Sequence, residues 1–501
     1  MTSRYQCIYF ASKLQSNPAY ISIIAQDPRL LPNSSSYIVV HTTPSHTIAK
    51  YTRRPADIEQ SHTVPAMGFE VRRTSRSYVR PAAATPAGSL ELSAIDRVVG
   101  LRHMVPSLNV YPPRGCGTAA GEGQLQQQSP ATVVREALGK ALVDYYPLAG
   151  RLVGGPGGPA SARVECTGEG AWFVEAVAGC SLEDVGRLEK YPFAIPEGDL
   201  LPDEAPGVQP LDLPLMMQVT EFTCGGFVVG LTSSHSITDG LGAAQFITAI
   251  GDYGRGLPKP RVTPIWSRGE LIPNPPKKLL SGPLPTPRTF QLRHLTVDLS
   301  SDSIERAKSQ FLQSTGRRCS TFDVAVARLW QARTRSLRLA DPSTRVSLGF
   351  FADARRLLRR RGGGGGGAGF YGNCFYTVTV SAESGAVAGA DTAGVVAMIR
   401  DAKARLPAEF ARWAAGERVE PDPYDLSFSY DLLFVSDWTR LGLDADYGWG
   451  TPSQVISFAF VPFMPKAIIG APPAPKAGAR IMTRCVEEEN SPEFRDEMEA
   501  F

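Results

Sequence analysis

Residues 218–250 constrain the fold of this chain more than any other part of its sequence. Two apolar runs, residues 218–222 and 227–231, flank the tripeptide Cys224-Gly225-Gly226, which is the composition of a β-hairpin. From Gly240 onward the apolar residues recur at helical spacing. A hairpin that passes through a short loop into a helix indicates a protein that combines sheets with helices.

The rest of the chain repeats this alternation of strand-like and helix-like segments. A proline opens a helix at Pro130, and residues 321–339 have the apolar spacing of an amphipathic helix. Further strands are predicted at residues 69–73, 295–299 and 376–380. The sequence therefore predicts the α/β class.

Composition divides the chain into four parts. Residues 1–66 are rich in Ser, Thr, Tyr and Pro and hold six basic and three acidic residues. We expect them to be an extension that is poorly ordered or not native, with Met67 as the working start; a transit peptide is the alternative, because acidic residues are few. The proline-rich residues 258–287 are the natural linker between an N-terminal domain, 67–257, and a C-terminal domain, 288–501.

Charge and cysteine content exclude several classes of function. The 501 residues carry 52 Lys and Arg against 49 Asp and Glu, and this near-balance gives no electrostatic footprint for nucleic acid. Eight cysteines without a C-x-x-C pair suggest neither a disulfide framework nor a zinc ribbon, so we expect a cytoplasmic protein. The apolar residues 455–471 are interrupted by Pro462, Pro465 and Lys466, which argues against membrane insertion.

His235 is the candidate for a general base. Only three histidines follow residue 66, and His235 alone ends an apolar strand and begins the sequence His-Ser-Ile-Thr-Asp-Gly. A loop at the end of a sheet can present such a side chain to a cleft, and imidazole suits proton transfer near neutral pH. The other two, His103 and His294, lie in segments without such a pattern.

The same H-x-x-x-D-G pattern has two other interpretations. In the first, His235 caps the strand and Asp239 caps the N-terminus of the following helix. In the second, His235 and Asp239 bind a metal, which is weaker because no third ligand cluster accompanies them in the sequence. The sequence has no P-loop, Rossmann glycine pattern or G-x-S-x-G elbow, so a nucleophilic Ser or Cys has no motif.

A second candidate motif lies near the C-terminus. It reads Asp446-Tyr447-Gly448-Trp449-Gly450, and two glycines around a tryptophan predict a tight turn with a fixed indole. Taken alone, the motif also fits a tryptophan that only packs a loop.

Together the two motifs resemble those of the plant BAHD family of acyl-CoA-dependent acyltransferases, which carry H-x-x-x-D and D-F-G-W-G. Here Tyr447 replaces the phenylalanine of the second motif. The non-ribosomal condensation domains share H-x-x-x-D-G but usually carry a histidine just before it, where this chain has Ser234. The resemblance spans residues 67–501, and further similar stretches are residues 145–152, 352–355, 371–374 and 436–441.

The resemblance implies a fold of two chloramphenicol-acetyltransferase-like domains. Each would be a mixed sheet with flanking helices, and the active-site channel would lie between them. His235 would be the base in a direct transfer without an acyl-enzyme. Asp239 would pair with Arg355 and lock the loop that carries the histidine.

The second motif would contribute to the same active site. By this resemblance Trp449 would donate its indole N–H to the oxyanion and so count as catalytic. The neighbouring residues with a structural role at the active site would be Asp446, Gly448 and Gly450.

The resemblance also implies the substrates. Acyl-CoA would be a co-substrate, with no permanently bound cofactor and no metal, and the enzyme would be a monomer. Residues 69–97 look like the branch of benzoyl- and hydroxycinnamoyl-CoA alcohol transferases, which includes monolignol transferases of grasses. Val105 stands where shikimate-using members carry threonine, which favours a less polar alcohol.

Three points stay open from the sequence. Amine acceptors occur in the same branch, so N-acylation is an alternative, and a catalytically silent binding module of the same fold is another. The arginines at 355–356 and 359–361 are candidates to meet the CoA phosphates, but a solvated basic loop is the simpler and preferred account. The residues that bind CoA are therefore left unassigned.

Overall fold

The structure, a computed structural model, describes residues 21–22, 39–42, 45–48, 69–114, 128–155, 158–273, 288–358, 367–425 and 428–501. The chain divides into two compact units, Met1–Ala66 and Met67–Phe501. In the first unit, three short strands form an antiparallel sheet: β1 (Ile21–Ser22), β2 (Val39–Thr42) and β3 (Ser45–Ile48). The expectation of poor order in residues 1–66 falls mostly on residues outside those described.

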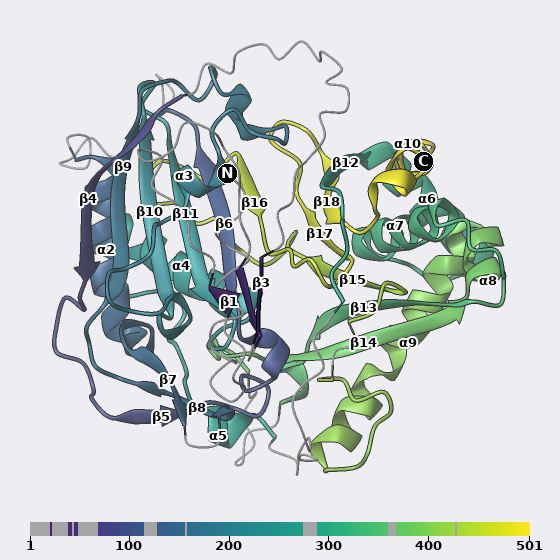
Figure 1. Ribbon diagram of the computed structural model, residues 1–501, viewed down its shortest axis with the longest axis horizontal. Helices are drawn as coiled ribbons and strands as arrows, with labels where there is room; N and C mark the ends of the chain where they lie inside the picture. The colour runs from purple at the N-terminus through teal and green to yellow at the C-terminus, as the bar shows by residue number, and fades with distance from the viewer. Residues whose placement is uncertain are drawn as a thin grey trace. The chain divides into compact units, whose positions relative to one another are not determined.

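Two six-stranded sheets dominate the second unit (Figure 1). The first sheet has the order β16-β6-β11-β10-β9-β4, and the second has the order β12-β18-β17-β15-β13-β14. The strands of the first sheet are β4 (Val71–Val79), β6 (Met104–Tyr111), β9 (Ala171–Ala178), β10 (Leu215–Phe222), β11 (Phe227–Ser234) and β16 (Gln454–Ser457). Those of the second are β12 (Leu295–Ser300), β13 (Arg345–Asp353), β14 (Phe375–Glu383), β15 (Leu432–Asp437), β17 (Lys466–Gly470) and β18 (Gly478–Arg484). A small sheet joins β5 (Ser89–Glu91), β8 (Gly158–Glu165) and β7 (Arg151–Gly155).

Helices pack on both large sheets and bury their apolar faces there. The first sheet shares its core with α2 (Pro130–Asp144) and α4 (Gly240–Gly254). The second shares its core with α6 (Ser301–Thr315), α7 (Thr321–Ser336), α9 (Thr392–Ala414) and α10 (Ser491–Glu499). Shorter helices are α3 (Glu197–Leu200), α5 (Arg268–Leu271) and α8 (Ser384–Gly389).

Local sequence accounts for the elements that were predicted. Strands β10 and β11 pair antiparallel across a turn in which Gly225 has φ +82°, so the predicted hairpin is confirmed. Helix α2 begins at Pro130, and its N-cap Ser129 accepts a hydrogen bond from the Thr132 N–H. The α/β class with two packed sheets is therefore correct.

The two sheets do not follow the two halves of the sequence. Strand β16 comes from the C-terminal half, yet it pairs with β6 at the edge of the first sheet, with Val455 opposite Asn109. The apolar run that begins at Val455 does not indicate this partner. Residues 274–287, half of the predicted linker, lie outside the described part of the chain.

A shared apolar cluster joins the two sheets. It includes Leu108 of β6 and Ile456 of β16 on one side, and Ile468 of β17 and Met482 of β18 on the other. This contact fixes how the edge of the first sheet faces β17 and β18, and it therefore positions the site described below. Among the described residues, no helix has the length and apolarity needed to cross a membrane.

Candidate active site

The loop between β11 and α4 carries His235 and is held at both ends. The His235 N–H donates to the carbonyl of His103 over 3.0 Å, which ties the start of the loop to the residue before β6. Asp239 is the N-cap of α4 and accepts from the Gly242 N–H over 2.9 Å. Between them Ile237 is fully buried. The loop therefore has a fixed conformation.

His235 lies where the first sheet meets the second. Its ring centroid is 6.4 Å from that of Phe351 on β13 and 6.4 Å from that of Phe375 on β14. The ring of His103 lies 5.2 Å away on the side of the first sheet. The imidazole is thus presented by one sheet to aromatic side chains of the other.

Asn373 fixes which nitrogen of His235 carries the proton. The Asn373 amide group donates to a carboxylate oxygen of Asp96 over 2.8 Å and to the His235 carbonyl over 2.7 Å, and both of these can only accept. The amide oxygen of Asn373 is therefore the atom 3.1 Å from His235 Nδ1, so Nδ1 must be the donor. The neutral ring then has its lone pair on Nε2, which is the arrangement a general base requires.

A buried ion pair holds Asn373 in turn. Asp96 and Arg268 are each 1% exposed, and Arg268 Nε lies 2.8 Å from the Asp96 carboxylate. The same carboxylate accepts from the Asn373 backbone N–H, while Arg268 also donates to the Ile237 carbonyl of the histidine loop. Because a buried charge is costly unless it is paired and hydrogen-bonded, this network favours a single arrangement.

A second ion pair locks the other end of the loop. Arg355 reaches the two carboxylate oxygens of Asp239 over 2.7 and 3.0 Å, and it also donates to the Gly372 carbonyl. Burial alone would raise the pKa of Asp239, but Arg355 and the N–H groups of Cys374 and Gly242 hold it below its ordinary value. The structure thus brings Arg355 and Asp239 together, with Asp239 turned away from the imidazole towards the arginine.

The environment keeps the histidines neutral. Burial is the main cause that lowers the pKa of His235, and the Lys466 ammonium adds to it. Burial, His235 and Lys466 lower the pKa of His103 to about 3, and its Nδ1 donates to the Gly100 carbonyl over 2.9 Å. His235 is therefore unprotonated at neutral pH, as a base must be.

The second motif lies elsewhere, and the prediction that Trp449 donates to the oxyanion is wrong. The Trp449 ring packs 5.4 Å from Phe227, the first residue of β11, whereas His235 follows the last. At about 3.3 Å per residue, the ends of this strand are on the order of 20 Å apart. The indole N–H therefore cannot reach an oxyanion beside His235.

The neighbours of Trp449 are structural, but they are not at the active site. Asp446 accepts from the N–H groups of Gly448 and Gly450 over 2.7 and 2.8 Å, and both glycines have positive φ. The Arg114 guanidinium lies 4.1 Å from the centre of the Trp449 ring and donates to the Gly448 carbonyl. These contacts fasten the motif to the far end of the first sheet.

Sequence reasoning missed the residues that orient the histidine. Asn373 was noticed only as part of a similar stretch, and Asp96 and Arg268 had no assigned role. Position 242 gives a further signal, because a Cβ at Gly242 would lie 1.9 Å from the Tyr371 carbonyl oxygen. The glycine at this position is what lets α4 approach the segment that carries Asn373.

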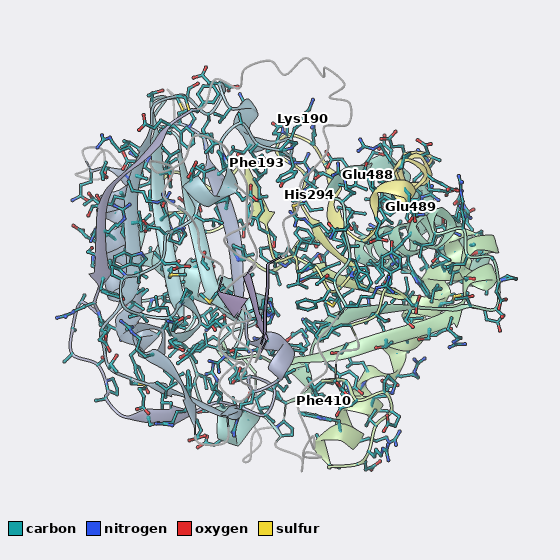
Figure 2. All side chains as sticks on the ribbon, in the orientation of Figure 1. Lys190, Phe193, His294, Phe410, Glu488 and Glu489 are labelled. Carbon is teal, nitrogen blue, oxygen red and sulfur yellow. The ribbon has the colours of Figure 1, made fainter. Side chains whose placement is uncertain are left out.

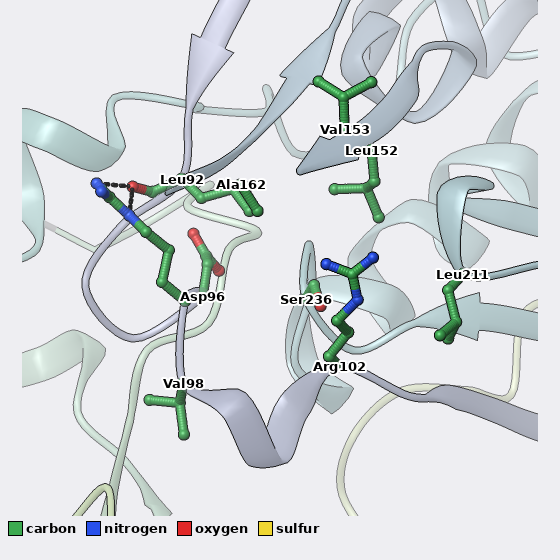
Figure 3. A pocket seen from close by; sticks show the side chains of 10 residues that line it. Leu92, Asp96, Val98, Arg102, Leu152, Val153, Ala162, Leu211 and Ser236 are labelled. Atoms are coloured by element: carbon green, nitrogen blue, oxygen red, sulfur yellow. Dashed lines mark hydrogen bonds between the residues drawn. The ribbon is translucent and has the colours of Figure 1, made fainter. Parts of the chain in front are cut away.

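A small pocket next to the loop does not include His235. It reaches Ser236 and is lined by Leu92, Asp96, Arg102, Leu152 and Leu211 among others (Figure 3). Within the described ranges, no group of three or more His, Cys, Asp or Glu side chains could hold a metal ion.

Comparison with known proteins identifies the class. The model of the Transferase family matches residues 69–500. The chain is 66% identical to Acyl transferase 4 of Oryza sativa subsp. japonica, over 87% of this chain and 100% of that protein. It is 38% identical to the myricetin 3-O-glucosyl 1,2-rhamnoside 6'-O-caffeoyltransferase AT2 of Crocosmia x crocosmiiflora, again over 87% and 100%. The crystal structure of vinorine synthase has the same fold, with a TM-score of 0.63 and 20% identity over 86% of this chain and 98% of that one.

The fold and these relatives define an acyltransferase built on two packed sheets. The chain belongs to the BAHD family of acyltransferases, which act on acyl-CoA.

Proposed function

We propose that the protein transfers an aromatic acyl group, hydroxycinnamoyl or benzoyl, or an acetyl group from its CoA thioester to the hydroxyl of a small alcohol. The aromatic side chains Phe351 and Phe375 beside His235 favour a flat acyl group or acceptor at this point. The name of the caffeoyltransferase relative supports a hydroxycinnamoyl donor, since caffeoyl is a member of that class.

The reaction needs one base and no acyl-enzyme. Nε2 of His235 takes the proton of the alcohol as its oxygen attacks the thioester carbonyl. The tetrahedral intermediate then collapses, the carbon–sulfur bond breaks, and the imidazolium returns the proton to the thiolate. The products are the ester and free CoA, and the histidine ends in its starting state.

One observation carries this proposal: the side chain of Asn373 accepts from Nδ1 of His235 over 3.1 Å, while burial keeps the ring neutral. A histidine that merely capped a strand would not need its tautomer fixed by a buried ion-pair network. The contacts of Asp239 and Arg355 support a positioning role for both, because they reach the loop and not the imidazole.

The test is the release of CoA thiol from acetyl-, benzoyl-, p-coumaroyl- and feruloyl-CoA with a panel of aromatic alcohols and amines. The wild-type chain should release CoA only when an alcohol is present. Removing a general base lowers the rate by about 10²–10⁴-fold, so the His235→Ala variant should lose that release while keeping its unfolding midpoint.

Three results would change the proposal. Release with amines alone would replace O-acylation by N-acylation. Release that survives in His235→Ala would remove the histidine from the chemistry. A folded protein that releases no CoA with any pair would favour the silent binding module.

A further inference from the structure

Two cations lie directly opposite each other on β17 and β18. Lys466 pairs with Arg484 in the antiparallel register, and residues opposite each other in such a pair point to the same face of the sheet. Two positions along, the pair Ile468 and Met482 on this face packs against Leu108 of the first sheet. Lys466 and Arg484 therefore face the space between the two sheets.

Neither cation has an anionic partner among the described residues. In the part of the chain that the structure describes, no carboxylate forms an ion pair with Lys466 or Arg484, and Arg484 Nε is buried without a hydrogen-bond partner. The next arginine on the same face, Arg480, has the carboxylate partner that Arg484 lacks within the described ranges. Arg480 binds both carboxylate oxygens of Asp298, over 2.7 and 2.8 Å, and donates to the Glu189 carbonyl.

Lys466 lies on the side of the site described above. It pairs with Phe434 in the parallel register of β15 and β17, the Phe434 ring lies 4.7 Å from that of Phe351, and the Phe351 ring lies 6.4 Å from that of His235. In this position the Lys466 ammonium helps to lower the pKa of His235 and His103, and Arg484 helps to lower that of His294. Burial lowers the pKa of Lys466 itself to about 8, so it still carries its charge at neutral pH.

Aromatic rings lie beside Arg484 and His294. The Arg484 guanidinium lies 5.5 Å from the centre of the Phe460 ring, and the Tyr191 ring lies 4.0 Å from that of His294. His294 Nδ1 is a second buried atom without a partner. Figure 2 labels His294 and Phe193, which lie between the two large sheets.

Like charges directly opposite each other in a sheet are destabilising, and partly buried cations without counter-ions add to that cost. An anionic ligand removes both penalties. We propose that Lys466 and Arg484 bind a carboxylate of the substrate beside His235, so that the enzyme prefers a substrate that carries a carboxylate in its acceptor or acyl part. This inference rests on the proposed acyl transfer at His235.

The CoA phosphates are a poorer occupant of this site. The long pantetheine arm separates them from the reacting thioester, whereas Lys466 pairs with Phe434, whose ring contacts Phe351 next to His235. The proposal also changes what Val105 indicates about the acceptor. Val105 of β6 is apolar and packs against the cluster between the sheets. Strands β17 and β18 face it and carry the charged side chains of Lys466 and Arg484, so an apolar residue at 105 does not exclude a charged substrate.

The experiment compares each acid with a partner that lacks the free carboxylate. The acceptor pair is p-(hydroxymethyl)benzoate and its methyl ester, both with p-coumaroyl-CoA. The donor pair is malonyl-CoA and acetyl-CoA, both with benzyl alcohol. Preference in the first pair places the carboxylate on the acceptor, and preference in the second places it on the acyl group.

The wild-type enzyme should favour the acid in one pair by roughly tenfold or more in kcat/KM, as expected for a charge pair shielded from water. Lys466→Met and Arg484→Met should each reduce that preference to less than about threefold, because either change removes half of the site. The matched control is Lys476→Met, an exposed lysine between the same two strands, which should keep the preference.

Binding separates this inference from the proposed function. In His235→Ala, which should not turn over, p-(hydroxymethyl)benzoate or malonyl-CoA should still raise the unfolding midpoint more than the partner that lacks the free carboxylate, and Lys466→Met should abolish the difference. Absence of turnover in the wild type with this binding intact would refute only the proposed function. The inference is overturned if neither pair shows preference in rate or binding, or if the preference survives in both cation variants. It is also overturned if Lys466→Met lowers kcat equally for the acid and for the partner that lacks the free carboxylate, since the lysine would then act on the reaction and not on a carboxylate.

Discussion

The two ends of β11 look equally significant in the sequence and have different roles in the structure. At one end, His235 begins a loop in which two buried ion pairs hold Asn373 and Asp239 in place. At the other, Phe227 packs against Trp449 in a motif whose hydrogen bonds close its own turn and join it to Arg114. A compact motif of glycine and aromatic residues therefore indicates a fixed turn. An active site is indicated instead by side chains that are held in a defined orientation towards one another.

The largest expected effect comes from breaking the ion pair behind the histidine. Asp239→Asn leaves Arg355 without its carboxylate in a site where both side chains are about one-tenth exposed. We expect an unfolding free energy lower by about 3 kcal/mol, since a broken buried pair leaves an uncompensated charge. Activity should fall by about 10²-fold or more, because displacing the loop displaces the base. Both are measured on the same protein, by thermal unfolding and CoA release.

Asp353→Asn is the control for that variant. Asp353 also contacts Arg355, over 3.0 Å, but it is 36% exposed, so its loss should cost less than about 1 kcal/mol. A wild-type melting curve combined with complete loss of activity in Asp239→Asn would contradict the positioning role and place Asp239 in the reaction.

The next effect concerns the tautomer of His235. Asn373→Ala removes the acceptor of the Nδ1 proton. We expect kcat to fall by on the order of 10²-fold, because the orientation and tautomer of the His235 ring are then no longer fixed. KM for the acyl-CoA should stay unchanged, since Asn373 faces the histidine and Asp96 and no other part of the site. Steady-state kinetics check this. A higher KM with an unchanged kcat would show that Asn373 shapes the binding site instead.

At the opposite end of β11 the expected effect is on stability and not on rate. Trp449→Phe should lower the free energy of unfolding by about 1 kcal/mol, because it weakens the contact with the Arg114 guanidinium and the packing on Phe227. Its kcat should remain within about twofold of the wild type, whereas loss of an oxyanion donor costs 10²–10³-fold. A loss of that size would show that the Trp449 indole takes part in the reaction. It would contradict the difference in role between the two ends of β11.

The smallest effect is a change in pH dependence. Burial and Lys466 hold the pKa of His235 below its ordinary 6.5, so the neutral base persists as the pH falls below that value and activity is lost only at lower pH. Lys466→Met removes one of the two causes, so the acidic limb of kcat/KM should move to higher pH. The pH profile of Lys476→Met should match that of the wild type. An acidic limb that stays in place would mean that burial alone sets the pKa of His235.

Much of the fold could be read from local patterns. The hairpin of β10 and β11 and the starts of α2, α4 and α7 follow from turn residues, caps and apolar spacing within a few positions. The pairing of β16 with the first sheet could not be predicted. The sequence of a strand shows which residues point to the same face, but it does not show which strand pairs with it. The partner is decided by packing between segments far apart in the chain.

The sequence by itself determined the family and the α/β class and singled out His235 as the candidate base, because each of these depends on residue types at short, fixed spacing. Only the tertiary structure decided that Asn373, Asp96 and Arg268 orient His235 and that Trp449 lies at the far end of the strand. It also decided that Lys466 and Arg484 share a face on which no described carboxylate pairs with them. Asn373 lies 138 positions from His235, and Asp96 lies 277 positions from Asn373. Contacts at such separations depend on how the two sheets are packed together, and no local pattern in the chain encodes that distance.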